Sequence, residues 1–266
     1  MQADVSTSSR SASNAVRLDS LAILAFAVAL IGGEAVAITF GIQPALVYEA
    51  VVLAAMSFYA ALGRLSRPGL RVLFVLAIVP LTRVASIALP QRIVPQIYWD
   101  ALPAAVALFS VAGIRILVGE QLLPWFPRST RGWVAQVAVA LAGIPLAIAA
   151  IEGSLPSPLD AHLTRPYVTV ALVAGFAGLV LEVLFRGAIQ PALVRMFGWW
   201  GVLLATLVYA AMFLGTGSTW LVGAALVTGT IWGVAAAATR AVAGVAVSHM
   251  LFAMIWATAW FVKFHQ

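Results

Sequence analysis

Long apolar segments follow one another along this chain, separated by short stretches that contain Gly, Pro or charged residues. A helix that crosses a bilayer needs about 20 mostly apolar residues. The pattern therefore predicts an all-α, polytopic transmembrane helix bundle with about nine spans, or about eight if the fourth, seventh or eighth segment is re-entrant. The segments are residues 20–41, 44–63, 71–90, 96–118, 132–152, 167–190, 199–215, 219–238 and 241–262.

The parts of the chain outside these segments are short. Residues 1–18 are rich in Ser and Ala, and we expect them to form a flexible N-terminal tail. Residues 19–152 then hold the N-terminal transmembrane helices, and residues 153–266 hold a C-terminal transmembrane core. The core spans are rich in small residues, which favour close helix packing. We expect the step from Gly229 to Gly233 to serve packing within the chain.

The composition excludes several classes of protein. Hydrophobic residues make up 63% of the 266 residues and charged residues 9%, whereas about a quarter of a soluble domain is charged. A soluble enzyme and a disordered protein are therefore excluded. The net charge of +6 comes from arginines spread over several loops, so we expect the lipid bilayer and no nucleic acid as a partner. The absence of cysteine excludes disulfides, thiolate metal sites and a Cys nucleophile.

The distribution of basic residues predicts an orientation, because cytoplasmic loops are enriched in Lys and Arg. We expect an integral protein of the bacterial cell (inner) membrane with its N-terminus in the cytoplasm. An odd number of spans then places the C-terminus outside, and a re-entrant segment would reverse that end. The cytoplasmic set is Arg10, Arg17, Arg64, Arg67, Arg71, Arg128, Arg131, Arg195 and Arg240, against Arg92, Arg165 and Lys263 outside.

Aromatic side chains near the ends of the predicted spans indicate an interfacial belt, because Trp and Tyr gather where the bilayer meets water. We expect this role rather than ligand stacking. The belt residues are Tyr98, Trp99, Trp125, Trp133, Trp199, Trp200, Trp220 and Trp260.

Ionisable side chains within the predicted spans are candidate functional residues, because a charge in lipid is costly. Glu34 and Arg83 are expected to form a structural ion pair between N-terminal helices. Glu49, Asp100 and Arg115 lie nearer to span ends, and we expect them to reach the interface by snorkelling.

A second ionisable group lies in the C-terminal core. Glu182 and Arg186 are four residues apart in one helix, in the order that favours contact between carboxylate and guanidinium. The spacing alone favours a structural intrahelical pair. His249 lies within the last span, where a lone histidine is more often a hydrogen-bonded core residue than a catalytic group or a metal ligand.

The stretch LEVLFRGAIQ at residues 181–190 resembles the first signature of the CPBP intramembrane proteases (the CAAX protease and bacteriocin-processing, or Rce1-like, family). That signature is usually Glu-Glu-x-x-x-Arg. The order of the later helices is also similar, since the family continues with Phe-x-x-x-His and ends with His-x-x-x-Asn. The resemblance implies a CPBP-like core over about residues 167–262, with Glu182, Arg186 and His249 as the retained catalytic positions.

The chain departs from the family pattern at three positions. Leu181 stands where the family has its first Glu, the expected base for water. The second motif has no His and aligns either as Tyr209-x-x-x-Phe213, the preferred register, or as Phe213-x-x-x-Gly217. Ala253 stands at the last Asn position. Because a catalytic metal normally has three protein ligands, we expect neither the divalent metal of the family nor another cofactor.

Three functions follow from these observations. The first is a CPBP-like membrane protein with lost or reduced endopeptidase activity that acts as an accessory or binding subunit for a membrane protein or peptide. The second is an active intramembrane endopeptidase that uses Glu182 and His249, which then have to converge on a water-accessible cavity. The third is a transporter or channel, which would require a polar path lined by Glu34, Arg83 and Glu182.

Overall fold

The computed structural model describes residues 5–62, 68–88, 97–117, 119, 121–153, 167–216 and 218–264. Within these ranges the chain forms helices and contains no β-strand. The prediction of an all-α helical bundle is confirmed. The elements, in chain order, are α1 (Val5–Phe40), α2 (Ile42–Leu62), α3 (Pro68–Leu76), α4 (Ile78–Ala88), α5 (Ile97–Leu117), α6 (Thr130–Gly153), α7 (Tyr167–Glu182), η2 (Val183–Ile189), α8 (Gln190–Phe197), α9 (Trp200–Ala211), η3 (Leu214–Thr216), α10 (Thr219–Thr239) and α11 (Ala243–Phe264).

Each of the nine predicted apolar segments corresponds to one helix or to two or three consecutive helices. Among the residues that the structure describes, six stretches are long and apolar enough to cross a membrane. Helices α5 and α11 have 21 and 22 residues, whereas α9 has 12. The seventh predicted segment, one of the three that could be re-entrant, forms the short helices α9 and η3. The eighth segment forms the full-length helix α10.

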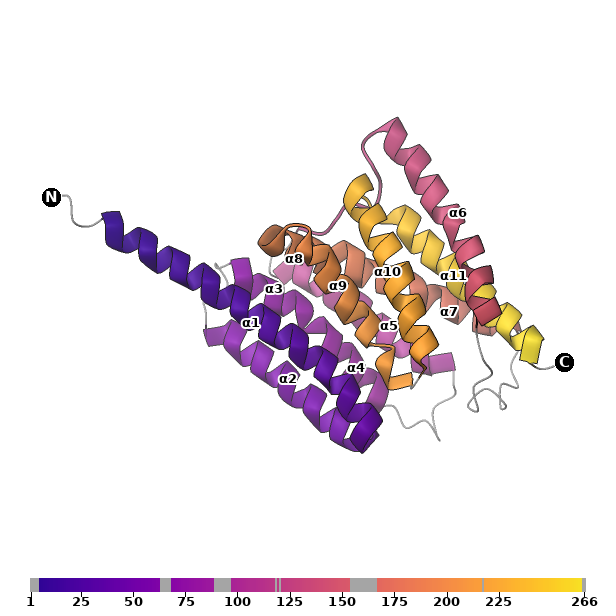
Figure 1. Cartoon of the computed structure of the whole chain (residues 1–266), viewed down its shortest axis with the longest axis horizontal. Helices are drawn as coiled ribbons and strands as arrows, with labels where there is room; N and C mark the ends of the chain where they lie inside the picture. The colour runs from indigo at the N-terminus through magenta and orange to yellow at the C-terminus, as the bar shows by residue number, and fades with distance from the viewer. Residues whose placement is uncertain are drawn as a thin grey trace.

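Helix α1 is longer than predicted and projects beyond the rest of the bundle at its N-terminal end (Figure 1). It begins at Val5, so the helix extends into the segment that we expected to be a flexible tail. Residues 1–4 lie outside the described residues.

The helices pack as two groups that share one hydrophobic core. Helices α1 to α5 pack on one another, and α5 and α1 then contact α7 and α9 of the C-terminal group (Figure 1). The larger cluster of buried apolar side chains runs from α1 through to α10, and a smaller one joins α10 and α11. The N-terminal helices are therefore packed directly against the C-terminal core.

Helix α6 packs against α11 and α10, so the expected boundary at residue 152 separates α6 from the helices that it contacts. The side chain of Gln136 holds it there. Its Nε2 donates a hydrogen bond to Thr239 Oγ1 at 2.6 Å, and its Oε1 accepts one from the backbone N–H of Gly244. These bonds connect α6 to the turn between α10 and α11 and give the buried N–H of Gly244 an acceptor.

The aromatic residues near the helix ends are exposed where their side chains are described. Trp125, Trp133, Trp199, Trp200 and Trp220 are all exposed, as an interfacial belt requires. The side chains of Tyr98, Trp99 and Trp260 lie outside the described residues.

Candidate functional site

The polar residues of the core lie where one long helix changes its hydrogen-bond pattern. Helices α7 and α8 are joined without a break by the π-helical segment η2, in which the backbone N–H of Gln190 donates to Phe185 O. Pro191 has no N–H for the carbonyl of Gly187 four residues earlier. That carbonyl instead accepts a hydrogen bond of 2.8 Å from Leu123 N. Short π-helical segments are frequent at functional sites.

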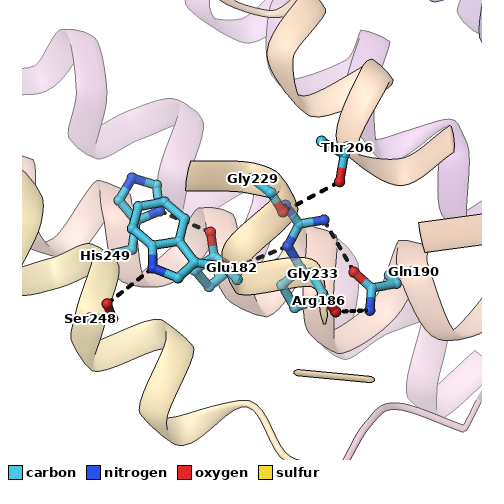
Figure 2. A network of polar contacts seen from close by, with 9 residues as sticks. Glu182, Arg186, Gln190, Thr206, Gly229, Gly233, Ser248 and His249 are labelled. Atoms are coloured by element: carbon cyan, nitrogen blue, oxygen red, sulfur yellow. Dashed lines mark hydrogen bonds and ion pairs between the residues drawn. The ribbon is translucent and has the colours of Figure 1, made fainter. Parts of the chain in front are cut away.

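Glu182 contacts two partners at the end of α7 (Figure 2). Its Oε1 lies 3.0 Å from Nδ1 of His249 in α11, and its Oε2 lies 3.4 Å from Nε of Arg186 in η2. Glu182 and Arg186 are 0% exposed and His249 is 5% exposed. The expected intrahelical pair is therefore present, and α11 adds the imidazole to it.

Arg186 uses its remaining nitrogens to join η2 to α8 and α10. Its Nη1 donates to Gln190 Oε1 at 3.2 Å, and its Nη2 donates to the carbonyl of Gly229 at 2.7 Å (Figure 2). Gln190 Nε2 in turn donates to the carbonyl of Gly233 at 2.8 Å. We call Glu182, Arg186, Gln190 and His249 the polar cluster.

Helix α10 approaches the polar cluster closely because two of its residues have no side chain. A Cβ atom added at Gly229 would lie 2.9 Å from Tyr209 Cδ1 and 3.2 Å from Arg186 Nη2, and one at Gly233 would lie 3.1 Å from Gln190 Oε1. The two carbonyls thereby come within reach of Arg186 and Gln190. The expected role of Gly229 and Gly233 in packing within the chain agrees with these contacts.

Aromatic rings fix the imidazole of His249. The ring stacks on Trp232 with centroids 4.3 Å apart and an angle of 24° between planes. Trp232 Nε1 donates to Ser248 Oγ at 3.0 Å, which orients the indole. Helices α7 and α11 meet at Gly178, where an added Cβ atom would lie 3.1 Å from His249 Cδ2 and 3.3 Å from Ala253 Cβ.

A cavity of about 190 Å³, the interhelical cavity, lies between the N-terminal helices and the core. Leu181 and Phe213, which stand at the family positions for the base and the second-motif His, both line it. Because Leu181 and Phe213 line the same cavity, the structure supports the register Tyr209-x-x-x-Phe213. The alternative register ends at Gly217, which lies outside the described residues. The other lining residues are Thr82, Arg83, Ser86, Pro103, Ala104, Ala107, Ala177, Val180, Leu184 and Met212.

The polar cluster lies outside the lining of the interhelical cavity. None of Glu182, Arg186 and His249 lines the interhelical cavity. The convergence of Glu182 and His249 that an active endopeptidase requires is present, but at a buried position. The polar path that a transporter would require is also interrupted, because Arg83 lines the interhelical cavity and Glu182 does not.

A divalent metal does not fit the residues of the polar cluster. The cluster offers one carboxylate and one imidazole, which contact each other, and the guanidinium of Arg186 lies beside the same carboxylate. A catalytic metal normally has three protein ligands. Among the residues that the structure describes, no group of three His, Asp or Glu side chains could hold a metal ion.

The ionisable residues of the N-terminal helices lie apart from the polar cluster. Arg83 Nη2 donates to Glu34 Oε2 at 2.7 Å, which confirms the expected ion pair between α1 and α4. The expectation that Glu49 snorkels is wrong, because Glu49 is 2% exposed. Gly33 leaves room for it, since a Cβ atom there would collide with the carboxylate of Glu49. Arg115 is exposed, and the side chain of Asp100 lies outside the described residues.

Sequence reasoning missed one member of the polar cluster and two aromatic residues that contact it. Gln190 continues the four-residue spacing of Glu182 and Arg186 and could have been found from it. Tyr209 and Trp232 resemble ordinary apolar span residues, and only the packing of α9 and α10 brings them to Arg186 and His249.

The model of the family described as "Type II CAAX prenyl endopeptidase Rce1-like" matches residues 163–255. No curated protein and no solved structure matches the chain. The matched range includes Glu182, Arg186 and His249, and it confirms the resemblance over α7 to most of α11. The chain is therefore an integral membrane protein whose C-terminal core is similar to the CAAX prenyl endopeptidases of the Rce1-like family.

Proposed function

We propose that this protein has lost or much reduced the peptidase activity of its family and acts as an accessory or binding subunit in the bacterial cell membrane, with its N-terminus in the cytoplasm. Its partner in this proposal is a membrane protein or a peptide. The single observation that carries the proposal is the lining of the interhelical cavity by Leu181 and Phe213.

The chemistry of peptide hydrolysis supports the proposal. The reaction needs a base for the attacking water and donors for the oxyanion. The interhelical cavity has an alkyl and a phenyl group at the two positions where the family carries Glu and His. The remaining carboxylate, that of Glu182, faces Arg186 and His249 in a fully buried position. The surviving polar residues thus act as a structural connection between helices.

A peptidase assay tests this proposal. The full chain is reconstituted in nanodiscs and incubated with a fluorogenic peptide that ends in a prenylated CAAX sequence, beside an Rce1-like enzyme with complete motifs as positive control. We expect no cleavage above that of the Glu182→Gln variant. Robust turnover that Glu182→Gln abolishes would favour the second function instead, an active endopeptidase that uses Glu182 and His249.

Restoration of the missing groups gives a complementary test. The variant Leu181→Glu/Phe213→His/Ala253→Asn places a carboxylate and an imidazole on the wall of the interhelical cavity. We expect it to cleave the prenylated peptide more than the parent chain does. The matched control Leu181→Gln/Phe213→Asn/Ala253→Ser has similar polarity without a base, and we expect it to remain inactive. Equal activity of both variants would contradict the assignment of these positions.

The binding role requires its own measurement. A photo-crosslinking amino acid at position 213 faces the interhelical cavity, whereas the same group at the exposed position 199 faces the surroundings of the bundle. In native membranes we expect a discrete crosslinked product from position 213 that position 199 does not give. The same pattern of products from both positions would indicate that no partner enters the cavity.

A further inference from the structure

A second and larger cavity lies beside η2 and shares no lining residue with the interhelical cavity. It measures about 640 Å³ and is bounded by the end of α5, the loop at residues 121–129 and the π-helical segment. Its lining includes Arg115 and Arg128 as well as Val183 and Gly187 of η2. We call it the loop cavity.

The wall of the loop cavity is held by backbone hydrogen bonds to the core. Leu123 N donates to Gly187 O at 2.8 Å. The carbonyl of Pro124 accepts a bond of 3.1 Å from Val242 N, just before α11, and that of Trp125 accepts one of 3.0 Å from Ala243 N at its start. The loop therefore packs in a defined position although it contains no regular secondary structure. A preorganised cavity needs less ordering when a ligand binds.

The polar groups of the loop cavity favour an anion. Arg115 and Arg128 line it, and no described carboxylate does. Glu120, the nearest acidic residue in the sequence, lies outside the described residues. A guanidinium presents several donors in one plane, which suits the oxygens of a phosphate group. Both arginine side chains are exposed, so a ligand can reach them from the surroundings.

The apolar groups of the same cavity favour an amphiphile over a small soluble anion. Leu122, Leu123 and Val183 form part of the lining beside the two arginines, and Trp125 is 45% exposed at its rim. Trp side chains at this kind of position mark the boundary between headgroups and acyl chains. A ligand with a phosphate and an apolar tail satisfies both parts of the lining.

The surrounding charge is also positive. Arg195 Nη1 donates to Gln121 O at 3.4 Å, so the end of α8 lies beside the loop. Arg131 and Arg240 belong to the same set of basic residues that predicts the cytoplasmic side. Anionic lipids are enriched in that leaflet, and basic pockets between transmembrane helices bind their headgroups.

We propose that the loop cavity binds one anionic phospholipid, with the phosphate of the headgroup between Arg115 and Arg128 and the start of an acyl chain against Leu122 and Val183. This site is separate from the polar cluster, and it does not depend on the proposed loss of peptidase activity. Because Val183 and Gly187 form part of its lining, the bound lipid contacts the π-helical segment that carries Arg186.

Native mass spectrometry of the full chain in detergent tests the site by titration with phosphatidylglycerol and with phosphatidylcholine of identical acyl chains. We expect one phosphatidylglycerol to bind at least about tenfold more tightly than phosphatidylcholine, and Arg115→Gln/Arg128→Gln to remove this preference. The matched control is Arg131→Gln/Arg240→Gln, which removes the same charge from exposed positions outside the lining. An equal loss in the control, or no preference in the parent chain, would overturn the proposal.

A competition experiment tests whether the bound phosphate belongs to a phospholipid or to a soluble phosphate compound. Inorganic phosphate and glycerol 3-phosphate are added in large molar excess to the complex with phosphatidylglycerol. We expect neither to displace the lipid, because both lack the apolar chain. Displacement by either would overturn the assignment of a phospholipid and indicate a soluble phosphate compound.

A fluorescence measurement keeps the proposal testable if the double arginine variant unfolds. Phosphatidylglycerol with brominated acyl chains quenches nearby tryptophans. We expect stronger quenching by this lipid than by brominated phosphatidylcholine in the parent chain, and a loss of most of the difference in Trp125→Phe. An unchanged difference in Trp125→Phe would place the lipid elsewhere and contradict the site.

Discussion

Two consecutive residues of α7, Leu181 and Glu182, have different chemical surroundings. Leu181 faces the interhelical cavity, whereas Glu182, the next residue, faces Arg186 and His249 in the polar cluster. The comparison distinguishes two functions that one family signature combines, namely the connection of helices and the reaction. Glu182, which the resemblance counts among the retained catalytic positions, here connects helices, whereas Leu181 is apolar where the family has its base.

The polar cluster also differs from the interhelical cavity in its hydrogen bonds between helices, although Glu182 Oε2 and Arg186 Nε, 3.4 Å apart, have no hydrogen-bond partner among the described residues. Arg186 reaches a side chain of α8 and a carbonyl of α10, and Gln190 reaches a second carbonyl of α10. Buried ion pairs contribute to stability only when such additional hydrogen bonds are present. We therefore expect substitutions in the polar cluster to affect folding strongly and substitutions in the cavity wall to affect it weakly.

The largest effect is expected from Arg186→Leu. The change leaves the carboxylate of Glu182 buried without its cation and removes the donor to Gly229 O, so the free energy of unfolding should fall by about 3–5 kcal/mol. Thermal unfolding in detergent measures it, with Arg131→Leu at an exposed position as control. If an uncompensated charge is the cause, Glu182→Leu/Arg186→Leu will recover part of the loss, and an equally unstable double variant would contradict this explanation.

The next effect is expected from Gly229→Ala. The added methyl group would meet the ring of Tyr209 and the guanidinium of Arg186, which should cost about 1–3 kcal/mol of unfolding free energy. Gly223→Ala in the same helix is the matched control, because its Cβ atom meets nothing within 4 Å. That control should be neutral or stabilise by up to about 1 kcal/mol. Equal unfolding temperatures for the two variants would show that α10 does not pack against the cluster as described.

A smaller effect is expected from Leu181→Glu, at the neighbouring position that lines the interhelical cavity. The new carboxylate would enter a cavity that Arg83 also lines, so we expect a cost below about 2 kcal/mol. Leu193→Glu serves for comparison, since Leu193 is 0% exposed and does not line this cavity. The variant at position 193 should be clearly less stable in thermal unfolding. The reverse order would mean that the cavity does not accept a polar group.

The smallest effect is expected from Thr206→Val. Thr206 donates a 3.3 Å hydrogen bond to Gly229 O, but the same carbonyl accepts a shorter bond from Arg186. Because the acceptor keeps its stronger donor, the loss of unfolding free energy should stay below about 1 kcal/mol. Chemical unfolding of the parent chain and of Thr206→Val measures this loss. A loss comparable to that of Gly229→Ala would make Thr206 an essential member of the cluster.

The helices could be predicted from the sequence because membrane insertion depends on local apolar length. The contact of Glu182 with Arg186 could also be predicted, since it depends only on spacing in one helix. The contact of Glu182 with His249 needed the family resemblance, because 67 residues separate them. The burial of Glu49 could not be predicted, since it depends on how closely α2 approaches Gly33 in α1.

The polar cluster has a consequence for how the chain enters the bilayer during synthesis. Glu182 and Arg186 leave the ribosome together, but the carbonyl of Gly229 and the ring of His249 follow 43 and 67 residues later. A nascent chain that stops before α11 must hold the Glu182 carboxylate in lipid without its imidazole. The Glu182 carboxylate therefore gains its full set of partners only after the last helix has been made.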